Sequence, residues 1–314
     1  MIDNQLPKIS GFGLTVVDIL MQIENGIHLY QKNPVGMQMV QLGGVVPTAL
    51  VTASRLGLDS RLYTAFGSDK FSEILYDIFE KEKVKTEEIG NPDLYQTPLS
   101  VVAIDKRTGE RTGFNSQGDF PKLAPSSITV PLDSDTSILL IDGHNPSCSL
   151  QFLKEAHKLG ARVLLDLGNP KEGMEEIIKE ADFLIVPQAY WKTVWPNIPV
   201  KKVMTELLKI GPKTVIITMG PQGCLIGNSQ EVFHQPAFDI NVIDTNGAGD
   251  IFFGAFVYGL ASKWDFKKIT TFAAGAAGYS CQRYGKQEKI PKSVGDIENF
   301  ISTNKLRTFN FNLL

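Results

Sequence analysis

The feature that most constrains this sequence is a regular exchange between short apolar runs and longer amphipathic segments from residue 137 to residue 218. The apolar runs are rich in Val, Ile and Leu and predict strands, whereas the segments between them predict helices. Strands that alternate with helices indicate a parallel sheet with helices on both faces, which is an α/β fold. The expected strands are Ile138–Ile141, Val163–Leu167, Phe183–Val186 and Thr214–Thr218, and the expected helices are Ser149–Leu159, Gly173–Glu180 and Val200–Ile210.

The length and charge of the chain favour a small-molecule partner. With 314 residues, of which 43% are hydrophobic, the chain can form one large α/β domain or two unequal ones. The 31 Lys and Arg residues against 34 Asp and Glu residues include no dense basic run, which argues against nucleic acid and anionic membranes as partners. No apolar signal core opens the sequence and no run reaches membrane-spanning length, so we expect a cytoplasmic protein.

The three cysteines predict no metal or redox chemistry. Cys148, Cys224 and Cys281 are odd in number, far apart in the sequence and without C-x-x-C spacing. This pattern argues against disulfides, zinc and thiol catalysis, so buried thiols are expected.

A glycine-rich turn, Asp244–Asp250, separates the strand-like residues Ile240–Ile243 from the apolar run Ile251–Leu260, which predicts a buried helix. Gly247, Ala248 and Gly249 carry almost no side chain, so their amides can approach an anion at the start of that helix. This segment, the anion turn below, therefore predicts phosphate binding.

Asp250 would fall in the first turn of that helix, where its carboxylate could accept a proton from an attacking hydroxyl. The alternative is an ordinary turn in which Asp244 or Thr245 only caps the helix.

The sequence D-T-N-G-A-G-D at 244–250 resembles the D-T-x-G-A-G-D signature of the ribokinase-like (PfkB) family of carbohydrate and nucleoside kinases. The resemblance runs over nearly the whole chain and implies a three-layer parallel-sheet ribokinase-like fold with a small β-sheet lid. It implies that Asp250 is the general base, that Gly247, Ala248 and Gly249 form the anion hole, and that Asp244 and Thr245 bind the cofactor. ATP and Mg²⁺ are the implied cofactors, and a requirement for a monovalent cation stays open.

Two β excursions interrupt the α/β pattern. Val17–Ile23 alternates and is followed by Asn25-Gly26 and the strand-like Ile27–Tyr30, which predicts a hairpin. A second hairpin is predicted from Leu99–Ile104 and Arg111–Asn115, joined by residues 105–110. The resemblance assigns both to the lid, 14–44 and 94–120, and leaves 1–13, 45–93 and 121–314 as the core.

Asp18, at the start of the lid, is expected to bind sugar hydroxyls; the alternative is a solvated carboxylate on an edge strand. Exposed lid strands also present edges that could pair between protomers, so a homodimer through the lid stays open.

The stretch Gly43-Gly44-Val45-Val46-Pro47-Thr48-Ala49-Leu50 predicts a tight turn that feeds a helix of small residues. It resembles the family signature G-G-x-x-x-N-x-A, with Thr48 where Asn is usual, and implies substrate binding by Gly43, Gly44 and Thr48. His144 follows a predicted strand, where it would either contact substrate or be structural. Asp69 in Gly67-Ser68-Asp69 is interpreted as structural.

Two stretches resemble the nucleotide half of the family. Thr218-Met219-Gly220-Pro221-Gln222-Gly223 matches T-x-G-x-x-G and implies phosphate contacts from Thr218, Gly220 and Gly223; an ordinary β-turn is the alternative. Ala273–Gly278, with Gly285, resembles the small-residue helix and turn beside the adenine, which implies a contact from Ala277, although small residues also permit close helix packing.

The sequence departs from the family at the N-x-x-E motif, which helps to organise Mg²⁺. Gln188 can replace the Asn, but Trp191 cannot replace the Glu, so the metal ligands stay unknown. Gly11-Phe12-Gly13 lacks the third glycine of a dinucleotide fingerprint, and no Walker loop is present.

These observations predict an ATP-dependent kinase that phosphorylates a hydroxyl, expected to be primary, on a small sugar or sugar derivative. The alternatives are a nucleoside kinase of the same fold and a catalytically silent protein that binds sugar or nucleotide. The sequence does not identify the sugar.

Overall fold

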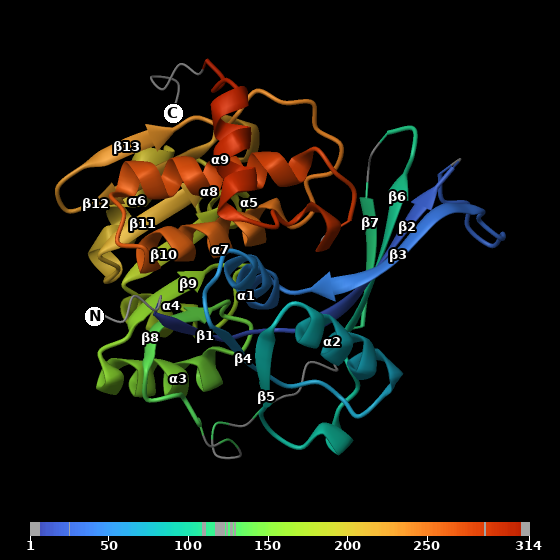
Figure 1. The fold of residues 1–314 in the computed structure, drawn as a ribbon, viewed down its shortest axis with the longest axis horizontal. Coiled ribbons are helices and arrows are strands. Elements are labelled where there is room, and N and C mark those ends of the chain that lie inside the picture. Colours follow the sequence, from blue (N-terminus) through green and yellow to red (C-terminus); the bar gives the residue numbers. More distant parts are fainter. Residues whose placement is uncertain are drawn as a thin grey trace.

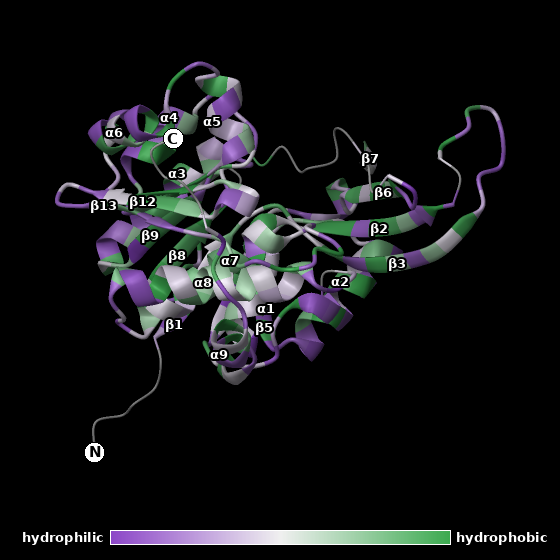
Figure 2. Cartoon of the chain, turned by 90° about the horizontal axis from the view of Figure 1, so that it is seen from above, coloured by the Kyte–Doolittle hydropathy of each residue, from purple (hydrophilic) through white to green (hydrophobic). Residues whose placement is uncertain are grey.

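The computed structural model describes residues 7–308, except residues 25, 109–110, 117–122, 124, 126–127, 129 and 286. Its described strands form two sheets, a large one inside an α/β core and a small one that extends from the side of that core (Figure 1). Viewed from above, the small sheet stands away from the core as a separate arm (Figure 2).

The large sheet has the strand order β13-β12-β11-β10-β9-β8-β1-β4-β5. Seven neighbouring strands are parallel: β1 (Lys8–Phe12), β4 (Ser60–Thr64), β5 (Val84–Glu88), β8 (Thr136–Ile141), β9 (Arg162–Asp166), β10 (Phe183–Pro187) and β11 (Thr214–Thr218). The order reverses at β1, since later strands are added on both of its sides. At such a switch point the carboxyl ends of the strands leave a crevice in which ligands bind.

Helices cover both faces of this sheet, so its strands are apolar on both sides. In β8, Ile138 and Leu140 join one hydrophobic core, while Leu139 and Ile141 join the other. One core packs under α1 (Val45–Arg55), α2 (Lys70–Lys81), α7 (Ala248–Ala261), α8 (Phe266–Cys281) and α9 (Val294–Thr303). The other packs under α3 (Pro146–Leu159), α4 (Met174–Lys179), α5 (Gln188–Val194) and α6 (Val200–Ile210).

The predicted three-layer α/β fold is therefore confirmed, and the bounds of α6 and β11 agree with the sequence prediction. One edge differs, because β12 (Cys224–Asn228) and β13 (Val232–Gln235) run antiparallel to their neighbours. The chain reverses after β11 through the short helical turn Gly220–Gln222. This connection is too short for the crossover that a parallel strand would need.

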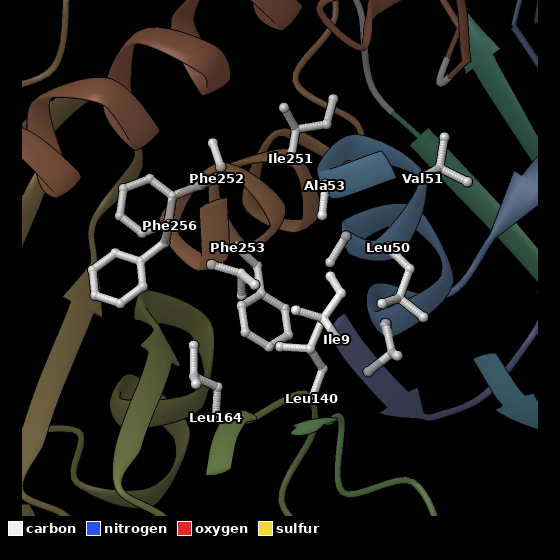
Figure 3. Close-up of a cluster of buried hydrophobic side chains, with 14 of the residues drawn as sticks. Ile9, Leu50, Val51, Ala53, Leu140, Leu164, Ile251, Phe252, Phe253 and Phe256 are labelled. Atoms are coloured by element: carbon white, nitrogen blue, oxygen red, sulfur yellow. The ribbon is translucent and has the colours of Figure 1, made fainter. Parts of the chain in front are cut away.

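Helix α7 is buried in the centre of the first core, as its apolar run predicted. Phe253 reaches toward Ile9 and Leu140 of the sheet, and α1 packs alongside (Figure 3). A Cβ at Gly254 would lie 2.4 Å from the backbone oxygen of Ala49 in α1, so the two helices touch through backbone. The anion turn thus begins a helix that the core holds firmly.

The small sheet has the order β3-β2-β6-β7, built from β3 (Val35–Gly43), β2 (Val16–Ile23), β6 (Leu99–Asp105) and β7 (Arg111–Asn115). The β6–β7 hairpin is confirmed, although Gly109 and Glu110 of its turn lie outside the described residues. The predicted partner of β2 was wrong, because β2 pairs with β3 and not with Ile27–Tyr30. Those residues belong to an exposed loop in which Asn33 Oδ1 accepts a hydrogen bond from the His28 amide at 2.7 Å. Asn25 lies outside the described residues.

The strand expected at Ile240–Ile243 is absent, which corrects a second prediction. Instead of a strand partner, the amides of Ile243 and Asp244 both donate to the carbonyl of Cys281, at 2.8 and 3.2 Å. Val242 and Ile243 are 53% and 49% exposed, so their apolar side chains do not belong to the core. The segment that leads from β13 into the anion turn is therefore held against the end of α8 and not inside a sheet.

The cysteines follow expectation in two of three places. Cys148 and Cys224 are buried, and burial raises the pKa of their thiols to about 11 and about 12. Cys281 is only half-buried and lines a cavity considered below. Among the described residues, no helix has the length and apolar character needed to cross a membrane.

Asp69 is structural, as interpreted from the sequence. Its side chain accepts hydrogen bonds from the Phe71 and Ser72 amides and caps α2, while its other oxygen accepts from the Thr97 amide at 2.8 Å. The Ser72 hydroxyl completes a reciprocal capping box, which explains a serine at that position. Asp69 thus ties α2 to the segment that leads into β6.

Candidate active site

The anion turn opens α7 without a side-chain cap. Gly247 is the N-cap residue with φ 73°, a left-handed conformation that glycine adopts without strain. The alternative in which Asp244 or Thr245 merely caps the helix is therefore wrong. The Ala248 amide donates to the Thr245 carbonyl at 3.2 Å, and the first bond along the helix runs from Ile251 to Gly247. The Gly249 amide lies between these two donors, at the positive end of the helix dipole.

Asp244, the first residue of the turn, is 4% exposed and does not line the cavity described next, which Thr245 lines. Its Oδ1 accepts a hydrogen bond from the Asn246 amide at 2.8 Å, and its Oδ2 lies 3.1 Å from Lys289 Nζ. The sequence predicted cofactor contact for Asp244, whereas its burial and partners make it a brace for the turn.

A cavity of about 400 Å³ opens beside the anion turn. It gathers Thr218, Gly220, Gly223, Thr245 and Ala277, five residues that the sequence assigned to the cofactor. The other lining residues are Pro221, Cys224, Ala237, Phe238, Ile240, Val242, Ala248, Gly249, Phe252, Ala274, Gly278, Cys281 and Arg307. Apart from Arg307 these are uncharged and mostly apolar, which suits the flat base of a nucleotide.

No sequence motif indicated that Phe238 and Arg307 line this cavity. An isolated bridge between Phe238 and Leu306 brings the end of the described chain back to the cavity. Arg307 is held there by an ion pair with Asp239 at 3.3 Å. These contacts join residues far apart in sequence, so no local motif could reveal them.

Asp18 lies on β2, inside the small sheet. Because β2 lies between β3 and β6, the alternative of an edge-strand carboxylate is wrong. A Cβ at Gly43 would lie 2.6 Å from Asp18 Oδ1, so Gly43 leaves the space that the Asp18 carboxylate occupies. The sequence assigned both residues to the substrate, and they are in contact.

The glycine turn before α1 needs its second glycine for backbone reasons. Gly44 has φ 100°, and a Cβ there would lie 2.0 Å from the Leu14 carbonyl oxygen. Thr48 is 1% exposed, and its hydroxyl donates to the Gly44 carbonyl at 2.7 Å. Thr48 therefore holds the turn, and its burial does not support the direct substrate contact predicted from the sequence.

Acidic side chains converge at the carboxyl ends of β8 and β9, next to the switch point. Asp142 Oδ2 accepts a hydrogen bond from the Leu14 amide at 2.8 Å, and its Oδ1 lies 3.2 Å from His144 Nδ1. Burial alone would raise the pKa of Asp142, but the charge and hydrogen bonds of His144 and the Leu14 amide outweigh it, so this pKa lies below its usual value. His144, 25% exposed, is thereby oriented at the crevice.

Asp166, at the end of β9, is the neighbour that the sequence located at a strand end without giving it a role. Burial raises its pKa well above the usual value, and the negative charges of Asp250 and Asp142 add to the effect. The negative charges of Asp250, in the first turn of α7, and of Asp142 therefore both act on Asp166, and these three carboxylates are called the acidic group below. Such clusters with perturbed pKa values are frequent at functional sites.

The donor set around this group fits a Mg²⁺ ion that arrives with a nucleotide. Among the described residues no three His, Cys, Asp or Glu side chains cluster as a dedicated metal site. Mg²⁺ is often held by one or two carboxylates together with phosphates and waters, and the acidic group offers carboxylates of this type. Gln188 donates to Gln222 Oε1 at 3.4 Å, and Trp191 is buried in the second core.

Comparison with known proteins gives a consistent result. The model of the pfkB family carbohydrate kinases matches residues 14–293. A ribokinase of Staphylococcus aureus is 25% identical over 261 residues, which are 79% of this chain and 84% of that protein. A ribokinase from Thermotoga maritima is similar in structure with a TM-score of 0.79 and 25% identity, covering 95% of this chain and 100% of that one. An Arabidopsis thaliana ribokinase complexed with ribose and ATP has a TM-score of 0.80 at 19% identity, covering 95% and 99% of the two chains.

Proposed function

Because this chain belongs to the pfkB family of carbohydrate kinases and is an ATP-dependent sugar kinase, we propose that it phosphorylates a primary hydroxyl of a small sugar or sugar derivative. The observation that carries this proposal is the position of the anion turn. Thr245, Ala248 and Gly249 of the turn line the apolar cavity of about 400 Å³, and its last residue, Asp250, belongs to the acidic group with Asp142 and Asp166. A phosphoryl group at the turn would therefore have a nucleotide on one side and an acceptor hydroxyl on the other.

In this proposal Asp250 is the general base. Its carboxylate takes the proton of the attacking hydroxyl while the oxygen–phosphorus bond forms and the bond from the γ-phosphorus to ADP breaks. The Gly249 amide and the positive end of α7 stabilise the charge on the transferred group. Of the amides expected in the anion hole, that of Ala248 contributes less, because it already donates to the Thr245 carbonyl.

We propose that the Asp18 carboxylate accepts hydrogen bonds from the hydroxyls of the sugar. His144 would contact the sugar from the other side of the proposed sugar pocket. The small sheet that carries Asp18 would close over the sugar and exclude water, which strengthens every electrostatic contact inside. Mg²⁺, when bound with ATP, would neutralise phosphate charge, and the carboxylates of Asp166 and Asp250 are the candidates to hold it.

The test is a panel of sugars and nucleosides incubated with ATP and Mg²⁺, with ADP release as the rate and phosphorus NMR to identify the ester. We expect a phosphate monoester on a primary hydroxyl of at least one sugar. Asp250→Asn should slow formation of this product by about 10²–10⁴-fold, whereas Asp93→Asn, on an exposed turn, should leave the rate unchanged.

Two other outcomes would replace the proposal. Faster phosphorylation of a nucleoside than of any sugar would identify a nucleoside kinase of the same fold. Binding of ATP and sugar by calorimetry, without any product, would identify a catalytically silent binding protein.

A further inference from the structure

Lys289 is a fully buried charge that the proposed chemistry does not use. Its side chain is 0% exposed and lies on the short helical turn Gln287–Lys289. An ammonium group is rarely buried in this way unless charge and hydrogen bonds compensate it. Here Nζ lies 3.1 Å from Oδ2 of Asp244 and 3.1 Å from the Asp244 carbonyl oxygen. The positive charge thus meets two oxygens of the first residue of the anion turn.

Asp244 connects Lys289 to the rest of the anion turn through a further hydrogen bond. Its other carboxylate oxygen accepts a hydrogen bond from the Asn246 amide at 2.8 Å, three residues before Gly249. Its own amide is held by the carbonyl of Cys281 at 3.2 Å. Movement of the Lys289 ammonium would therefore displace the turn that is aimed at the phosphoryl group.

The segment that carries Lys289 is itself held from the opposite side. Arg55, the last residue of α1, donates from Nη1 to the carbonyls of Gln287 and Ile290 at 2.8 and 2.9 Å. Its Nε and Nη2 bond both carboxylate oxygens of Glu82, at 2.7 and 2.6 Å. Lys289 is thus fixed between two anchored parts of the core and does not behave as a surface lysine.

We propose that Lys289 is a positioning residue that supplies a permanent cation beneath the anion turn, so that phosphoryl transfer in this chain needs no bound monovalent cation. Carboxylate and carbonyl oxygens, the partners of this ammonium, are also the oxygens that hard cations bind. Because the Lys289 ammonium is part of the chain, it stays beside the Asp244 oxygens whatever salt is present. It also adds positive potential behind the amides that face the transferred phosphoryl group. The inference rests on the proposed function, because it assigns that group to the turn.

The first test replaces K⁺ by Na⁺ or tetramethylammonium in the assay. Turnover of the natural chain should change less than about twofold. Lys289→Met should lower kcat by about 10- to 100-fold, less than the 10²–10³-fold typical for loss of a direct anion-hole donor, with the KM for ATP and sugar within about threefold. In Lys289→Ala, K⁺ or propylammonium should restore about tenfold of the lost rate. Lys292→Met, an exposed lysine of the same segment, is the matched control.

Lys289→Met leaves the Asp244 carboxylate buried without its cation, so the double variant Lys289→Met with Asp244→Asn separates folding from positioning. We expect the double variant to regain most of the melting temperature while kcat stays low. Recovery of both would show that the pair only neutralises a buried charge and would overturn the proposal. A natural chain that requires K⁺ would overturn it as well.

Failure of the proposed function would be visible separately, as a natural chain that phosphorylates no substrate in the panel. In that case the role of Lys289 is tested by measuring the binding of ADP with aluminium fluoride, which mimics the phosphoryl group during transfer. Lys289→Met should weaken this mimic at least tenfold and ADP alone by less than threefold. Equal weakening of both ligands would count against the positioning role.

Discussion

The two sides of the proposed site differ in the physical means by which they would hold a ligand. The side proposed for the nucleotide is an apolar cavity in which Arg307 is the charged lining residue, while the side proposed for the substrate carries Asp18 and the acidic group of Asp142, Asp166 and Asp250. A cavity of this kind selects by shape and tolerates small changes, whereas a polar pocket loses much affinity when one partner is removed. The difference predicts that substitutions on the substrate side cost more than substitutions on the nucleotide side.

The largest effect is expected at the junction of the two sides. Asp250→Asn should lower kcat by about 10²–10⁴-fold, the usual share of general-base catalysis, because the amide cannot take the proton of the hydroxyl. ATP affinity, measured by calorimetry, should stay within about threefold. A variant that keeps near-natural turnover would remove Asp250 from the chemistry. A loss of ATP binding equal to the loss of rate would show that the two sides are not separable.

The next effect tests the polar side alone. Asp18→Ala should weaken sugar binding about 5- to 150-fold, since loss of charge-assisted hydrogen bonds costs roughly 1–3 kcal/mol. ATP binding should barely change. Glu24→Ala is the matched control, because Glu24 is a lid carboxylate whose partner is Lys106 at the surface. If Asp18→Ala weakens both ligands equally, or neither, the small sheet does not cover the sugar.

Sequence reasoning succeeded where a feature is local. The anion turn, the buried helix α7 and the parallel strands β8 to β11 all follow from residues adjacent in the chain. It failed where distant segments decide the structure. The partner of β2 lies beyond an exposed loop that also contains strand-like residues, and Ile240–Ile243 is apolar because it flanks a cavity, not because it pairs in a sheet.

The candidate site divides in the same way. The signatures indicated the anion turn and the Thr218–Gly223 turn, which line one cavity, and Asp18 with Gly43, which are in contact; their roles toward nucleotide and sugar stay predictions. They gave no sign that Asp244 faces Lys289 or that Thr48 is buried, because burial depends on packing that one sequence does not reveal. The core and lid boundaries and a homodimer through the lid stay predictions.

A smaller effect is expected from filling the apolar side. Ala277→Leu should place extra methylenes in the nucleotide cavity and raise the KM for ATP about tenfold, within the 1–3 kcal/mol typical of overpacking. The KM for sugar and kcat at saturating ATP should change little. Ala189→Leu, on an exposed position of α5, controls for the added bulk. An increase in the KM for sugar, without an increase in the KM for ATP, would show that Ala277 belongs to the sugar side and not to the nucleotide side.

The smallest effect concerns the charge repulsion within the acidic group, in which Asp166 faces the charges of Asp250 and Asp142. The pKa of Asp166 is raised by burial and by Asp250 and Asp142, so the folded chain binds this proton more tightly than the unfolded chain does. The stability contributed by that proton is complete below the unfolded pKa and is lost as pH rises through the folded pKa. Asp166→Asn has nearly the same shape but cannot ionise. The melting temperature of this variant, compared with that of the natural chain, should therefore rise by a few degrees between pH 5 and pH 8. Asp93→Asn, at an exposed turn, should shift the melting temperature equally at every pH. Parallel curves for Asp166→Asn and the natural chain would mean that Asp166 is not a strained member of the acidic group, and the contrast between the two sides of the site would then rest on Asp18 and Asp250 alone.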